Sequence, residues 1–234
     1  MAQSVYHRFS AQSVERLAAL SDGIFAVAMT LLVLDLKVPV ATFEHHQEPL
    51  WIAGAFSAEA DWWRLIGGLL TRFLPYCVSF LTLGIFWIAQ QTELNFCARG
   101  DRVFTWLNLA FLFSVSLLPF STSLLAEFIA YRSALGIYWL NLLMLGATLF
   151  SGWRYAQRKK LLKEEVSAEL GRAIERRIVV FQILYFGSFV LSAVNTYLGI
   201  VLMLSCQVGS LVTGRNIFRK TPEAVAAELQ SDRL

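Results

Sequence analysis

Residues Arg16 to Pro39 read RLAALSDGIFAVAMTLLVLDLKVP, and this stretch decides the fold because it sets aspartates inside an apolar segment of membrane length. At about 1.5 Å per residue, a helix from Arg16 to Val38 is about 33 Å long, which matches a hydrocarbon core of about 30 Å. Asp22 lies about 9 Å in from the Arg16 end, and Asp35 lies about 20 Å beyond Asp22. The stretch therefore predicts a membrane-spanning helix with at least one acidic side chain within or at the edge of the apolar layer.

An acidic side chain at that depth is costly, so it usually faces a partner helix or a water-filled cavity and often marks an ion or proton path. The alternative is a structural ion pair in which Arg16, or another segment, neutralises Asp22. The residues of this helix leave both interpretations open.

One stripe of the same helix is mostly apolar and carries a single hydroxyl group. It consists of Gly23, Val27, Thr30, Leu31 and Leu34, at the i, i+4, i+7, i+8 and i+11 spacing of one helix face. Such a stripe is typical of a packing seam and also fits a pore lining. Periodicity alone does not separate these two roles.

The composition is that of an all-α, polytopic membrane protein. Of 234 residues, 56% are hydrophobic and 16% charged, against a charged fraction of about 25% in soluble domains. The net charge of +3 and the position of the basic residues in loops argue against a nucleic-acid partner. The polar first 15 residues show no cleavage site, so we expect the first apolar segment to be retained as a span.

Uncharged stretches predict six transmembrane helices per subunit in a single membrane domain. Pro119 should kink the third by leaving the carbonyl of Val115 without its amide partner, which a hydroxyl of Ser116 or Ser121, or a neighbouring helix, would satisfy. Asn195 and Thr196 divide the last apolar stretch into two spans. The six spans are expected at about 17–38, 65–91, 103–126, 133–153, 178–194 and 197–214, with a charged cytoplasmic segment at 154–177.

The distribution of basic residues predicts that both termini face the cytoplasm of a bacterial inner membrane. With six crossings, 16 of the 20 Lys and Arg residues fall on the side of the termini. The other four are Lys37, Arg64, Arg72 and Arg132.

Several motifs are missing from the sequence. It has no T-V-G-Y-G filter, no G-x-x-x-x-G-K-[ST] loop and no H-E-x-x-H helix. Cys77, Cys97 and Cys206 show no disulfide or metal-ligand spacing, and Ser, His and Asp residues show no triad spacing. We therefore expect neither an enzyme nor a bound metal or cofactor.

Three stretches resemble the prokaryotic six-helix members of the endolysosomal potassium channel family, transmembrane protein 175. The family's first helix typically has an R-x-x-x-F-S-D motif, and Arg16 to Asp22 read R-x-x-x-L-S-D. GIFW, ending at Trp87, looks like the end of the family's second helix, and SLLPFSTSLL, from Ser116 to Leu125, looks like its third. Leu20 replaces the usual aromatic residue of the motif, and Gln90 and Gln91 stand where members often carry histidines.

This resemblance implies a homotetramer in the lipid bilayer, with four first helices around a central pore for monovalent cations. In such members an apolar ring, rather than a carbonyl filter, forms the constriction. By position Val27 would form this ring, with Thr30 one turn outward and Leu31 and Leu34 beyond. Arg16, Ser21 and Asp22 would form the polar network that holds the helices together. Asp35 would concentrate cations at the outer mouth.

Three functions follow as hypotheses. The first is a potassium-preferring, passive cation channel in which K⁺ is the permeant ion and no cofactor is needed. The second is a proton-coupled transporter with Asp22 as relay, although the internal repeats and broken helices common in such carriers are not evident. The third is a structural membrane protein, for which a solid apolar seam at Val27 and Leu31 would be the sign.

Overall fold

The computed structural model describes residues 2–34, 36, 51, 55–129, 131–164 and 166–209, and it confirms the predicted all-α class. Among these residues the only β-type pairing is an isolated bridge between Cys97 and Leu162. The chain forms α1 (Ala2–Leu34), α2 (Ala55–Phe96), α3 (Arg102–Ser116), α4 (Leu118–Glu127), α5 (Arg132–Arg158), α6 (Ala168–Leu191) and a last described helix, Thr196–Gly209.

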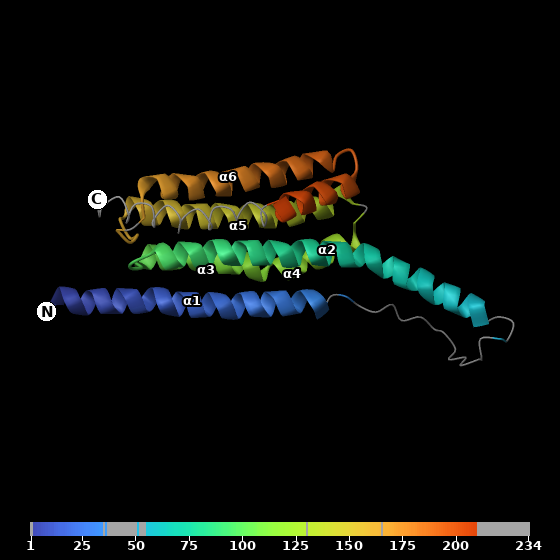
Figure 1. The fold of residues 1–234 in the computed structure, drawn as a ribbon, viewed down its shortest axis with the longest axis horizontal. Coiled ribbons are helices and arrows are strands. Elements are labelled where there is room, and N and C mark those ends of the chain that lie inside the picture. The colour runs from blue at the N-terminus through green and yellow to red at the C-terminus, as the bar shows by residue number, and fades with distance from the viewer. Residues whose placement is uncertain are drawn as a thin grey trace, which may run out of the picture.

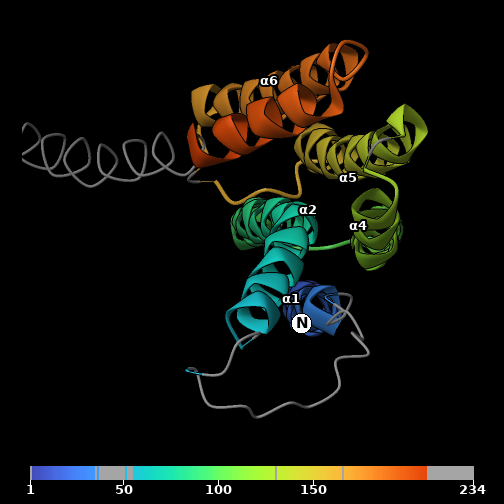
Figure 2. The same ribbon diagram turned by 90° about the vertical axis from the view of Figure 1, so that its right-hand side faces the viewer.

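The helices form an elongated bundle with α1 on one outer side and α6 on the other (Figure 1). Between them lie α2, α3 and α4, and then α5 (Figure 2). α1 contacts α2, α3 and α4, whereas α5 contacts α3, α4 and α6. The first helix is thus attached to the subunit along one side only.

Four segments within the described residues are long and apolar enough to cross a membrane. They are Val14–Leu34, Phe73–Phe96, Arg102–Glu127 and Arg132–Arg158, and they correspond to the first four predicted spans. The two predicted spans at 178–194 and 197–214 appear as the second half of α6 and the shorter helix Thr196–Gly209, joined at the predicted Asn195 turn. The described residues end at 209, so the end of the sixth span lies outside them.

The second and fourth helices are longer than their predicted spans. α2 begins at Ala55 rather than near residue 65, and its first part turns away from the bundle (Figure 1). α5 continues to Arg158, so the charged segment predicted at 154–177 is divided between the end of α5, a connection and the start of α6. Hydrophobicity marks where a helix is inside the membrane and does not mark where it ends.

The third span breaks at Leu117, two residues before the Pro119 at which a kink was predicted. The hydroxyls of Ser116 and Ser121 donate to the carbonyls of Phe113 and Leu118, and therefore do not serve Val115 as expected.

The neighbouring helix α5 instead completes the ladder at this break. With its amide oriented to satisfy all its partners, Asn141 donates to the carbonyl of Ser114 (3.0 Å) and accepts from the amide of Leu118 (3.1 Å). These are the two ends of one missing i→i−4 bond. The Asn141 side chain of α5 therefore replaces a backbone hydrogen bond of the third span.

The core is one large apolar cluster with a smaller one at the end of the bundle. In the large cluster Phe111 of α3 lies 6.1 Å from Phe25 of α1 and 6.2 Å from Phe86 of α2, measured between ring centroids. The smaller cluster joins the middle of α1, at Val14 and Leu17, to the two connections that meet at the Cys97–Leu162 bridge. Both clusters fix α1 against α2 and α3.

The first helix and its polar network

The two sides of α1 differ sharply in burial. One stripe is buried against the subunit and consists of Val14, Leu17, Ser21, Phe25, Ala28 and Leu32. This stripe, at i, i+3 and i+4 spacing, is the packing seam of the helix. It is not the stripe that the sequence singled out.

The predicted pore stripe lies on an exposed side of α1. Within the subunit 58% of Val27, 44% of Leu31 and 71% of Leu34 is exposed, and Gly23 has no atom near the position of an added Cβ. Large apolar side chains in a contiguous exposed row mark a surface that contacts lipid, another protein or a pore. Packing inside the subunit is therefore not the role of this stripe.

Thr30 lies on the same exposed side. Its hydroxyl donates a hydrogen bond of 2.8 Å to the carbonyl of Val27, one turn earlier. Because the proton is used within the helix, the hydroxyl oxygen keeps its lone pairs as acceptors. An acceptor of this kind can replace part of the hydration shell of a cation.

On the buried side, a chain of polar side chains crosses three helices. The Ser21 hydroxyl on α1 donates to Oε1 of Gln90 on α2, and Nε2 of Gln90 donates to Oδ1 of Asn108 on α3 at 3.2 Å. Asn108 in turn donates to the carbonyl of Phe104 at 3.1 Å. All three side chains are buried, so each hydrogen bond satisfies a group that would otherwise be costly in an apolar interior.

Asp22 makes a second connection to α2, at the exposed edge of the helix pair. Its Oδ1 accepts a hydrogen bond from Nε1 of Trp87 (2.8 Å) and another from Nε2 of Gln91 (2.6 Å). Trp87 and Gln91 are four residues apart and so lie on one face of α2. Asp22 is therefore held by two neutral donors, and it forms no ion pair with Arg16.

The structure unites only part of the predicted network. Ser21 and Asp22 both bond to α2, whereas Arg16 is exposed and contacts no polar side chain among those that the structure describes. Asp35, predicted at the outer mouth, lies outside the described residues. Gln90 and Gln91, which replace histidines in the resemblance, both take part in the bonding.

Trp87 and Asn108 belong to this site but were not predicted from the sequence. Asn108 had a usable signal, because it is an amide within the uncharged stretch 103–126, and polar groups in such stretches usually have partners. The sequence marks Trp87 only as part of the GIFW motif. Its indole N–H had no sequence signal that would assign it to Asp22.

Comparison with known proteins identifies relatives of this chain. A family model described as "Endosomal/lysosomal potassium channel TMEM175" matches residues 16–119. This range begins on α1 and ends at the second residue of α4. A protein of Streptomyces collinus named as a potassium channel is 31% identical over 170 residues, covering 70% of this chain and 75% of that protein. A potassium channel of Chamaesiphon minutus is 28% identical over 189 residues, covering 79% of this chain and 87% of that protein.

A solved structure also matches. The crystal structure of a lysosomal potassium-selective channel TMEM175 homolog from Chamaesiphon minutus superposes with a TM-score of 0.64 at 25% sequence identity. The match covers 86% of this chain and 98% of that chain. By sequence, by coverage and by fold, the chain belongs to the endosomal/lysosomal potassium channel TMEM175 family.

Proposed function

We propose that this protein is a potassium-preferring cation channel that conducts passively through a central pore. The relatives named as potassium channels match across most of the chain, which supports this class of function over an enzyme. The observation that carries the proposal is the exposed apolar row of α1, on a helix whose other side is fixed to its own subunit.

The pore requires more than one chain. A homotetramer would place four α1 helices around one axis, with Val27, Leu31 and Leu34 facing the axis. Their exposure in one subunit supports this arrangement, because it leaves the row available for contact with the α1 helices of other subunits. The hydrogen bonds from Trp87 and Gln91 to Asp22 form a clamp between α1 and α2. This clamp would hold each α1 in a fixed position against its own subunit.

The constriction would work by dewetting. A narrow ring of apolar side chains expels water, so an ion must shed part of its hydration to pass. Val27 would form this ring, and the hydroxyl oxygen of Thr30, one turn outward, would replace some of the lost water. No backbone carbonyl filter is involved in this mechanism.

The protein would lie in the bacterial inner membrane with both termini in the cytoplasm. The excess of basic residues on that side supports this orientation. It places the end of α2, the start of α3 and the end of α5 at the cytoplasmic surface.

Purified protein in planar bilayers under a K⁺ or Na⁺ gradient tests the proposal. We expect an unsaturated, ohmic current whose reversal potential follows the K⁺ gradient more closely than the Na⁺ gradient. Saturating flux with fixed coupling to protons would instead establish the carrier, with Asp22 as its relay. Subunit counting in the same membranes tests the tetramer.

A further inference from the structure

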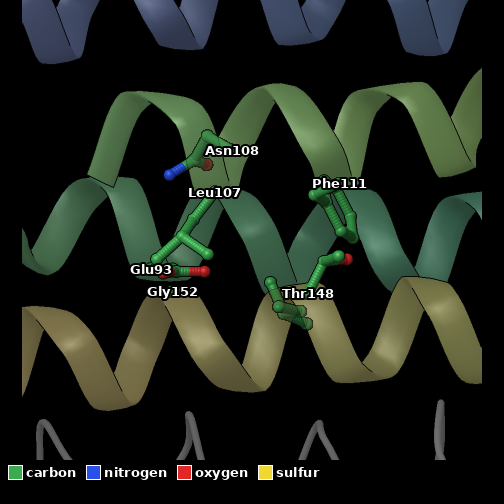
Figure 3. Close-up of a pocket in the computed structure, with 7 residues that line it drawn as sticks. Glu93, Leu107, Asn108, Phe111, Thr148 and Gly152 are labelled. Carbon is green, nitrogen blue, oxygen red and sulfur yellow. The ribbon is translucent and has the colours of Figure 1, made fainter. Parts of the chain in front are cut away.

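A buried carboxyl group lies at the proposed cytoplasmic end of the subunit, outside the site described above. Glu93 is one turn from the end of α2, only 3% exposed, and reaches between α3 and α5 (Figure 3). The narrow crevice around it is lined from those helices by Leu107, Asn108, Phe111, Thr148, Leu149 and Gly152. None of these six residues carries a charge.

The carboxyl group lies against the backbone of α5. Its Oε1 is fully buried and has no hydrogen-bond partner among the described residues. A Cβ added to Gly152 would lie 2.6 Å from this oxygen, so only glycine leaves room for it. Of the titratable groups nearby, the thiol of Cys97 follows the last residue of α2, and Lys163, in the α5–α6 connection, is close enough to that thiol to lower its pKa.

An ionised carboxylate in such a place would lack both water and a cation, which costs several kcal/mol, whereas the neutral acid costs much less. We propose that the Glu93 carboxyl group is protonated when α2, α3 and α5 are packed together. Loss of this proton drives the charged side chain out of the crevice and loosens the packing of the three helices. Glu93 is thus a proton-controlled latch on the subunit.

The latch is one turn from the polar chain that holds the pore helix. Gln90 precedes Glu93 by three residues on α2, and it bonds both Ser21 of α1 and Asn108 of α3. A movement of this turn of α2 therefore displaces the partner of Ser21. This second step, from latch to conduction, rests on the proposed channel function, whereas the latch itself does not.

Thermal unfolding of the purified full-length protein in detergent tests the latch without any current measurement. The packed state binds a proton that the unfolded chain releases near neutral pH, so stability should be greatest in mild acid and fall as pH rises. We expect the wild-type melting temperature to fall by several degrees more than that of Glu93→Gln between pH 6 and pH 9. The matched control, Glu164→Gln, removes an exposed carboxylate and should follow the wild type.

Infrared spectroscopy at pH 7.5 reports the proton directly in the wild-type protein, and the variants assign the band. We expect a protonated-carboxyl C=O band in the wild type that is absent from Glu93→Gln and present in Glu164→Gln. A wild-type spectrum with carboxylate bands only would overturn the proposal, as would identical pH profiles for the wild type and Glu93→Gln.

Gly152→Ala provides an independent variant, because its methyl group occupies the place of the Glu93 oxygen. We expect it to lose the protonated-carboxyl band and to melt at a low temperature whatever the pH. Gly84→Ala, where an added Cβ meets open space, is the control and should keep the band. Retention of the band in Gly152→Ala would contradict the assigned position of the carboxyl group.

The step to conduction is tested by changing pH on one side of a bilayer. We expect the wild-type K⁺ current to change severalfold with pH on the cytoplasmic side and that of Glu93→Gln to stay constant. If the infrared and melting results hold but both currents respond alike, the latch stands and its link to the pore is wrong. If no current flows at all, the channel function fails and the latch is unaffected.

Discussion

Gln91 on α2 donates a 2.6 Å hydrogen bond to the same carboxylate oxygen of Asp22 on α1 that accepts the indole N–H of Trp87. Replacing Asp22 by Ala should therefore remove two hydrogen bonds at a partly exposed edge, at a cost of about 0.5–1.5 kcal/mol for each bond. Asn keeps an acceptor at this position, so Asp22→Asn should cost less than Asp22→Ala. Thermal unfolding in detergent measures both.

Glu15 offers the control for this comparison, because it is exposed on the same helix. Glu15→Ala should change the melting temperature by less than either Asp22 variant. Equal stability of Asp22→Ala and the wild type would show that the clamp between α1 and α2 contributes nothing to the fold.

Val27 should set the size of the current. Val27→Ala widens the proposed apolar ring and should increase K⁺ conductance severalfold, whereas Val27→Leu narrows it and should lower conductance. Single-channel recording measures both, and equal currents from the two variants would refute the ring.

Val33 provides the matched control, because it is the same residue type, exposed on α1 but away from the stripe. Val33→Ala and Val33→Leu should leave conductance unchanged. A response of Val33 equal to that of Val27 would place a different side of α1 at the axis.

Asp35 should raise the local cation concentration at the outer mouth, an expectation that stands on its sequence position beyond Leu34. Asp35→Asn should lower the current clearly at 10 mM salt, where the Debye length is about 30 Å, and hardly at 1 M, where it is about 3 Å. The measurement is the ratio of mutant to wild-type conductance across salt concentrations. A ratio independent of salt would remove this role.

Asn141 should be necessary for the break in the third span. Asn141→Leu keeps the number and branching of side-chain heavy atoms but leaves the Ser114 carbonyl and the Leu118 amide without partners, at a cost of about 1–3 kcal/mol each. We expect a markedly lower melting temperature. Asn95→Leu, an exposed position near the end of α2, should change it little, and a similar loss in both variants would count against the bridging role.

Cys97 should be a poor nucleophile in the folded protein. The thiol is 5% exposed and follows the membrane-spanning part of α2; burial raises its pKa, and the nearby Lys163 only partly opposes this effect. Because the thiolate is the reactive form, iodoacetamide labelling of Cys97 should remain slow even between pH 8 and pH 9. Peptide mass spectrometry before and after denaturation measures this, and fast labelling of the native protein would contradict the burial.

Much of the membrane architecture could be predicted, because hydrocarbon thickness fixes how many uncharged residues a span needs. The four apolar segments and the turn at Asn195 follow from that rule. The ends of the helices do not follow from this rule, because α2 and α5 continue as regular helices through polar residues beyond their apolar segments. The position of the third-span break depends on Asn141, which lies on another helix and so cannot be read locally.

The candidate site, too, could be predicted only in part from the sequence. Periodicity identified the stripe of Val27, Thr30 and Leu34, but only the packed structure shows that a different stripe, including Phe25, faces the subunit. The motif residues Ser21 and Asp22 were recognisable, whereas their partners required the register between α1 and α2. The resemblance groups Arg16 with them through the R-x-x-x-L-S-D motif, and a motif along one helix does not reveal which neighbour lies opposite each residue.

The side chain that bridges Ser114 and Leu118 also imposes an order of events during biogenesis. The ribosome delivers the third span before α5, and until Asn141 arrives the two backbone groups have no partner in lipid. The nascent third span must therefore either remain a continuous helix or stay beside the translocon. Its break at Leu117 is stabilised only after α5 has been inserted.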